Sequence, residues 1–142
     1  MAAFDIDKVV LDFLYGRLNT PYFWGGAGPY YDCSGLIIEC LKMRGWVASS
    51  FDATAHDIFT RTLSGGTLKP KAHALSFYGT KQRIIHVGYC VSDTHMIEAG
   101  GGDSKTKTVE DAIKQSAFIR LRPIYHRKDF IGINVLDKSH FG

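Results

Sequence analysis

The segment from Thr20 to Leu41, TPYFWGGAGPYYDCSGLIIECL, places Cys33 between a glycine-rich loop and an amphipathic stretch. A helix that begins at Cys33 would surround the thiol with unpaired backbone N–H groups and the positive end of the helix dipole. Both favour the thiolate, the form of cysteine that acts as a nucleophile. Polar Asp32 and Ser34 flank the thiol, which is unusual for a cysteine that only packs. The sequence therefore predicts a reactive thiol at Cys33, and the alternative is a small buried side chain.

A nucleophilic cysteine needs a base, and His86 is the best candidate among the six histidines. The run Ile84-Ile85-His86-Val87-Gly88-Tyr89 places it in an apolar strand, where an unsatisfied imidazole is costly to bury. The alternative is a core histidine that a backbone carbonyl satisfies. Four other histidines lie in polar or loop-like segments, and we expect them to be solvated: His56, His73, His126 and His140.

Glu98 is the candidate for the group that orients this base. It interrupts the apolar stretch Met96–Ala99, which follows the His86 strand after a short turn. A carboxylate on the neighbouring strand could fix the tautomer of His86 and stabilise the imidazolium. His95 competes for the third position, although we expect it to be exposed at the turn. The alternative for Glu98 itself is a solvated side chain on the outer face of the strand.

The elements that must position these residues follow from the spacing of apolar side chains. Helices are expected from Asp5 to about Leu18, from Cys33 to about Arg44, from Thr54 to Leu63, and from Val109 to Lys114. Strands are expected at 74–78, 84–91, 96–99 and 118–122. Helices first and a mostly antiparallel sheet afterwards indicate an α+β architecture. We expect one domain over residues 1–142, with the tail after about residue 126 as a candidate flexible segment.

Composition excludes several classes of function. The net charge of +3, without a run of five or six Lys and Arg, gives no argument for nucleic-acid binding. The three cysteines have neither disulfide-framework nor zinc-like spacing, and no His-Glu-x-x-His motif occurs, so no metal and no cofactor are predicted. No stretch approaches the roughly 18 apolar residues of a membrane span, and no signal peptide is visible. We therefore expect synthesis in the cytoplasm, with separate delivery for any action outside the cell.

Four motifs together resemble the NlpC family of cell-wall cysteine peptidases, a compact papain-like group. They are, in the family's order, Tyr22-x-Trp24-Gly25-Gly26, Asp32-Cys33-Ser34-Gly35-Leu36, His86-Val87-Gly88 and Met96-Ile97-Glu98-Ala99. The resemblance spans roughly residues 5 to 125 and is strongest to short, single-domain forms encoded by tailed phages. It implies a papain-like domain in which N-terminal helices pack on a mostly antiparallel sheet.

The resemblance also implies roles for individual residues. Cys33 would be the nucleophile, His86 the base and Glu98 the orienting group. Tyr22 would help to stabilise the oxyanion, while Asp32 and Ser34 would shape the substrate pocket; Trp24, from the same motifs, is a candidate cleft residue. The family often has histidine where this chain has Glu98, and a carboxylate there is expected to raise the pKa of His86. A second departure is His73-Ala74-Leu75 in place of the family's common Gly-Asp-Leu.

The implied substrate is a peptidoglycan stem peptide, cut at the γ-D-glutamyl bond to the diamino acid. The implied setting is the cell wall, for a lytic or phage tail-associated enzyme with phage tail proteins as partners. Two alternatives stay open: a non-catalytic tail or wall-binding module that keeps the fold, and an acyltransferase or amidase on the same scaffold.

Overall fold

The computed structural model describes residues 4–142. Its helices are α1 (Ile6–Gly16), α2 (Cys33–Met43), α3 (Ala55–Arg61) and α4 (Val109–Gln115), with short 3-10 turns η1 (Leu63–Gly65) and η2 (Lys138–Phe141). Its strands are β1 (Gly66–Thr67), β2 (Ala74–Thr80), β3 (Arg83–Cys90), β4 (His95–Gly100), β5 (Phe118–Pro123) and β6 (Phe130–Val135). Each helix and strand expected from the sequence is present, with its ends within a few residues of the expected ones.

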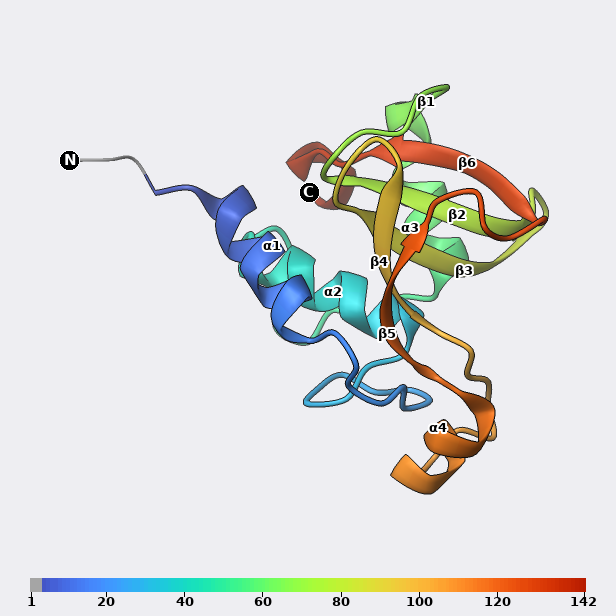
Figure 1. Ribbon diagram of the computed structural model, residues 1–142. Helices are drawn as coiled ribbons and strands as arrows, with labels where there is room; N and C mark the ends of the chain where they lie inside the picture. The colour runs from blue at the N-terminus through green and yellow to red at the C-terminus, as the bar shows by residue number, and fades with distance from the viewer. Residues whose placement is uncertain (1–3) are drawn as a thin grey trace.

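The strands form one antiparallel sheet in the order β1-β6-β2-β3-β4-β5. Helices α1 and α2 lie side by side next to this sheet, and α4 lies at the far end of the β4 and β5 arm (Figure 1). Helix α2 packs against β3 and β4, the two strands that carry His86 and Glu98. The fold is therefore the expected α+β arrangement, with the N-terminal helices packed on an antiparallel sheet.

Packing holds the two N-terminal helices in place. Helix α1 starts after Asp5, whose carboxylate accepts a hydrogen bond from the Lys8 backbone N–H. Its Val10 and Leu14, four residues apart, are fully buried. Isolated helices of 11 residues are only marginally stable in water. The free energy gained by burying each large apolar side chain, about 1.5–3 kcal/mol, therefore decides whether these helices form.

Side chains of β3 and β4 alternate between two apolar clusters. Val87 and Ile97 belong to the larger cluster, which includes the buried residues of α1 and α2. Cys90 and Met96 belong to a smaller cluster around Tyr78. This alternation is the period of two that a strand buried on both faces requires.

The segment after residue 126 differs from the expectation. It forms β6, which lies inside the sheet between β1 and β2 rather than in a flexible tail. Ile131, Ile133 and Val135 place β-branched side chains at alternate positions, and Ile133 is 2% exposed. Pairing with β2 on one side and β1 on the other satisfies the backbone of this strand, so the expectation of flexibility is wrong here.

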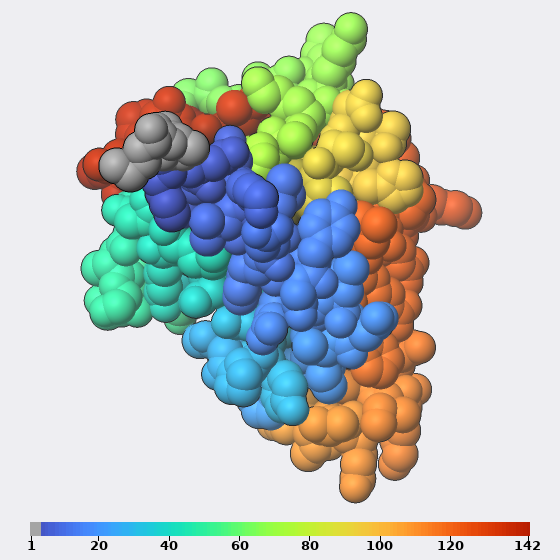
Figure 2. All heavy atoms as spheres, turned by 60° about the vertical axis from the view of Figure 1, so that its left-hand side comes forward, coloured from blue at the N-terminus to red at the C-terminus, as the bar shows by residue number. Residues whose placement is uncertain are grey.

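The glycine-rich loop that follows α1 lies against the segment that leads to and follows α4, and both lie at one end of the molecule in Figure 2. The Trp24 N–H donates to the Thr106 carbonyl at 2.8 Å, and the Tyr22 N–H donates to the Ala117 carbonyl at 3.0 Å. These bonds tie the loop before Cys33 to the β4–β5 arm. Within residues 4–142, no helix combines the length and the apolar character needed to cross a membrane.

Candidate active site

Helix α2 begins at Cys33, and Asp32 is its N-cap. The Asp32 carboxylate accepts the Gly35 N–H at 2.7 Å, the Gly25 N–H at 3.0 Å and the Ser34 hydroxyl at 3.4 Å. One side chain therefore caps the helix and fixes the glycine-rich loop beside it. A Cβ at Gly35 would stand 2.1 Å from the Gly26 carbonyl oxygen, so the loop touches the first turn of the helix.

The thiol of Cys33 opens into a groove of about 1130 Å³. Cys33 is half-buried, so it is accessible from this groove. The loop and helix side of the groove supplies Tyr22, Trp24, Asp32, Cys33 and Ser34; the sheet side supplies His86, and the β5–β6 loop supplies Arg127. All the predicted site residues except Glu98 thus line one cavity.

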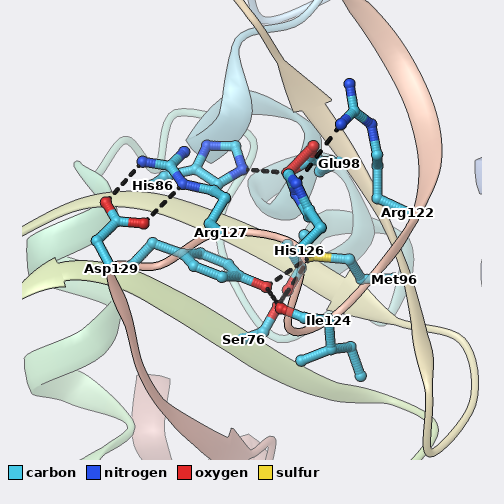
Figure 3. Close-up of polar contacts among 11 residues, drawn as sticks. Ser76, His86, Met96, Glu98, Arg122, Ile124, His126, Arg127 and Asp129 are labelled. Carbon is cyan, nitrogen blue, oxygen red and sulfur yellow. Dashed lines mark hydrogen bonds and ion pairs between the residues drawn. The ribbon is translucent and has the colours of Figure 1, made fainter.

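Glu98 stands behind His86. The His86 Nε2 lies 2.6 Å from the Glu98 Oε1, and the two side chains are only 7% and 4% exposed. Figure 3 shows the imidazole and the carboxylate pointing toward each other. Because Glu98 occupies Nε2, Nδ1 is the nitrogen of His86 left for the thiol.

The pKa of His86 reports this arrangement. Burial lowers the pKa, but hydrogen bonding and charge interactions with Cys33 and Glu98 outweigh it and raise the pKa of His86 to about 9. The direction is the one expected from a neighbouring carboxylate. Burial raises the pKa of Glu98, but the hydrogen bond and charge of His86 outweigh it, so the pKa of Glu98 lies below its usual range. At neutral pH the pair is therefore an imidazolium held by a carboxylate.

Glu98 has a second imidazole neighbour, His126, which the sequence does not predict at this site. His126 Nε2 lies 3.5 Å from the Glu98 Oε1; the residue as a whole is exposed, as expected, and its side chain is 20% exposed. The Arg122 Nη1 lies 3.5 Å from the His126 Nδ1 on the other side of the ring. On the remaining side, a Cβ at Gly100 would approach the Glu98 Oε2 to 2.8 Å. Glu98 is therefore held from several directions, with little freedom to turn away from His86.

Tyr22 is 4% exposed, with its ring against Gly102, where a Cβ would come within 2.3 Å of the ring. Burial, together with the charges of Cys33 and Asp32, raises the pKa of Tyr22 far above its usual value. Its hydroxyl is therefore a hydrogen-bond donor at any ordinary pH. Burial likewise raises the pKa of Asp32, although the N–H groups of Gly35 and Gly25 favour its carboxylate form. Trp24, at 49% exposed, offers an open aromatic face at the groove.

The remaining candidates lie elsewhere. His95, the competitor for the third position, bonds with its neighbour Thr94 at 2.9 Å, so the structure brings Glu98 and not His95 to His86. Cys40 and Cys90 are fully buried, and burial raises the pKa of both, that of Cys90 to about 12. They are inert thiols of the core.

Two other histidines differ from the expectation of solvation. His56 Nδ1 accepts the Ile84 backbone N–H at 3.1 Å, which anchors α3 to β3. His73 lies 2.7 Å from the Tyr89 hydroxyl beside the buried guanidinium of Arg44. Both bonds hold elements of the fold together; His56 also lines the groove, whereas His73 does not. Within residues 4–142, no cluster of three or more His, Cys, Asp and Glu side chains has the arrangement of a metal site.

His126 and Arg127 come from the β5–β6 loop, which reaches the site only because β6 returns the chain to β2. The signal that was available is the alternation of β-branched residues in β6, which predicts a strand. Nothing in the local sequence of the loop shows which part of the sheet it faces.

Comparison with known proteins identifies the family of the chain and solved structures with a similar fold. The family model described as the NlpC/P60 family matches residues 19–122, while no curated protein matches the chain. Similar solved structures include a NlpC/P60 family protein from Bacillus cereus, with a TM-score of 0.64 and 17% identity over 90% of this chain. The NlpC/p60 domain of the peptidoglycan hydrolase SagA has a TM-score of 0.64 and 20% identity, with 92% of this chain and 98% of that chain covered.

The P60 domain of the M. avium subspecies paratuberculosis antigen MAP1204 has a TM-score of 0.65 and 19% identity over 92% of this chain and 93% of that chain. This chain covers only 39% of the Bacillus cereus protein but nearly all of the two isolated domains. At these identities the structures agree in fold, and the sequence match extends over most of the chain. The chain belongs to the NlpC/P60 family.

Proposed function

We propose that this protein is a cysteine peptidase that hydrolyses an amide bond in peptidoglycan stem peptides. The observation that carries the proposal is the buried His86–Glu98 pair, which lies next to the half-buried thiol of Cys33 on one groove. A structural histidine needs only one hydrogen-bond partner, whereas this imidazole interacts with both a carboxylate and a thiol.

Acylation starts with the Cys33 proton already on His86 Nδ1, so that a thiolate lies beside the imidazolium. The thiolate then attacks the carbonyl carbon of the scissile amide, and the carbonyl oxygen becomes an oxyanion. Backbone N–H groups at the start of α2 and the Tyr22 hydroxyl are the donors available for this charge. Collapse of the tetrahedral intermediate breaks the C–N bond, and the His86 imidazolium protonates the leaving amine.

Deacylation uses the same imidazole. His86, now neutral, takes a proton from water, and the hydroxide attacks the thioester carbonyl. The second intermediate releases the new carboxylate and the Cys33 thiolate. Glu98 keeps the ring in one tautomer through both steps and stabilises each imidazolium that forms.

The substrate class is supported by the family and by the resemblance of the motifs. SagA, one of the similar structures, is named as a peptidoglycan hydrolase. For this chain we propose cleavage of the γ-D-glutamyl bond to the diamino acid of the stem. We also propose that it acts at the cell wall as a lytic or phage tail-associated enzyme; that proposal rests on the similarity of the Met96–Gly102 segment to short phage forms.

The decisive experiment is digestion of purified peptidoglycan, with mass spectrometry of the released muropeptides. The wild type should release new amino groups and fragments cut between glutamate and the diamino acid. Cys33→Ala should abolish release while retaining the circular-dichroism spectrum of the wild type. Cys90→Ala removes a buried thiol of the core and should keep turnover. Unchanged turnover in Cys33→Ala would refute the proposal.

Two other outcomes have distinct meanings. A wild type that binds peptidoglycan without cutting it would indicate a wall-binding module that keeps the fold. Transfer of an acyl group, or hydrolysis of a small amide in place of the stem peptide, would indicate an acyltransferase or amidase on this scaffold.

A further inference from the structure

Arg127 is a basic residue of the groove that two neighbours, Asp129 and Tyr78, hold in place. Its Nε and Nη2 donate to the two oxygens of Asp129, at 2.9 and 2.8 Å. Its guanidinium also lies over the ring of Tyr78, 5.2 Å from the centroid. A bidentate carboxylate and an aromatic face hold the guanidinium in one orientation, so little side-chain entropy is lost when it binds a further group.

The bidentate contact leaves donors unused. A guanidinium has five N–H groups, and Asp129 takes one edge of the fork. Among residues 4–142, no acceptor is bonded to the Nη1 of Arg127. The Arg127 side chain is 29% exposed and lines the groove, so the free edge is open to a ligand.

Arg127 is also close to the reacting groups. The Tyr78 ring that it covers lies 5.4 Å from the His86 ring, so the two side chains contact the same aromatic residue. The charge of Glu98 acts on Arg127, and the charge of His86 acts on Asp129.

We infer that Arg127 forms a carboxylate-binding subsite of the groove, which recognises a free carboxylate of the substrate next to the scissile bond. The inference rests on the proposed function. A glutamate linked through its γ-carbonyl keeps its α-carboxylate, three carbons from the bond that is cut. A diamino acid such as diaminopimelate brings a second carboxylate on the other side of that bond. Planar carboxylates match the free edge of a guanidinium.

Four synthetic peptides separate the two sources of the carboxylate. They are L-Ala-γ-D-Glu followed by meso-diaminopimelate or by lysine, each amidated at its C-terminal carboxyl group and each with the glutamate α-carboxylate either free or converted to the amide. The wild type should show kcat/KM about 10- to 100-fold higher for the peptides that carry the recognised carboxylate, the range of one charge-assisted hydrogen bond. The comparison that shows the difference, amide against acid or lysine against diaminopimelate, identifies which carboxylate is bound.

Two variants assign that preference to the guanidinium. Arg127→Gln should reduce the ratio of kcat/KM between acid and neutral peptides to near one, mainly through KM. Arg127→Lys keeps the charge without the planar fork and should give an intermediate ratio. Lys128→Gln makes the same charge change at an exposed position of the same loop and should keep the wild-type ratio. Thermal unfolding of each variant checks that the loop stays folded.

Each result bears on a separate claim. A wild type that cuts all four peptides equally, or an Arg127→Gln variant that keeps the full preference, overturns the subsite while the proposed function stands. A loss of preference in Lys128→Gln equal to that in Arg127→Gln also overturns it, because the effect would then be one of general charge. Failure of the wild type to cut any of the peptides or peptidoglycan overturns the proposed function and the subsite together.

Discussion

Replacement of Glu98 by glutamine tests whether the carboxylate controls the charge of His86. Glutamine has almost the same shape, and its side-chain oxygen can still accept the N–H of His86 across the 2.6 Å contact. The change therefore removes the negative charge and keeps the packing. Glu110→Gln, at an exposed position in the first turn of α4, is the matched control.

The magnitude follows from the pKa of His86, which moves from 6.5 to about 9. At about 1.4 kcal/mol per pKa unit, this corresponds to roughly 3 kcal/mol in favour of the imidazolium. Unit charges about 4 Å apart interact by about 4 kcal/mol at the effective dielectric constant of a protein, so Glu98 accounts for a large share. Burial, which lowers the pKa, stays in the variant. We therefore expect the pKa of His86 to fall by at least about one unit in Glu98→Gln.

The assay is the dependence of kcat/KM on pH for a stem peptide. Loss of the imidazolium at high pH removes the acid that protonates the leaving amine, so the alkaline limb reports the pKa of His86. In Glu98→Gln this limb should move to lower pH, with a lower maximum, whereas Glu110→Gln should follow the wild type. Alkaline limbs that coincide in the wild type and Glu98→Gln would show that the carboxylate does not set the charge of His86.

Three further predictions concern the thiols, the second imidazole and the C-terminal strand. Iodoacetamide should label Cys33 alone in the folded protein, because Cys40 and Cys90 are fully buried and become accessible only after unfolding. Mass spectrometry of the labelled peptides checks this, and labelling of Cys90 before unfolding would contradict it. His126→Gln should lower kcat about 3- to 10-fold and leave KM nearly unchanged, since His126 contacts Glu98 and does not line the groove; equal losses in KM and kcat would count against a positioning role. Truncation after residue 126 should leave the chain unfolded in far-UV circular dichroism, because it removes a strand that pairs on both sides; a truncated chain with native ellipticity and melting would show that β6 is dispensable.

The sequence was sufficient to predict the parts of the site that local rules control. The amphipathic stretch that follows Cys33 predicts a helix that begins there, and the structure has that helix, with Asp32 as its N-cap. The pairing of His86 with Glu98 was also within reach, because a short turn between two apolar stretches brings nearby positions of two strands together. Both rest on contacts between residues close in sequence.

The β5–β6 loop could not be placed in the same way. His126 and Arg127 reach the site because β6 inserts between β1 and β2, next to strands some 50 residues earlier in the chain. The position of β6 depends on which strand of the sheet has a backbone edge free for pairing. The sequence of the β5–β6 loop holds no information on that edge. Charged side chains near the C-terminus, such as Lys128 and Lys138, favour a solvated tail, because composition holds no information on the sheet edge that β6 completes.

The residues of the site come from two regions of the fold, which differ in how freely their sequences can change. Cys33, His86 and Glu98 come from α2 and the β3–β4 hairpin, where the burial of Glu98 and the raised pKa of His86 constrain one another. Arg127 comes from a loop between two strands, where substitutions disturb neither the helix cap nor the β3–β4 register. A carboxylate subsite at Arg127 would therefore let the peptide preference change while the nucleophile, the base and its orienting group stay fixed.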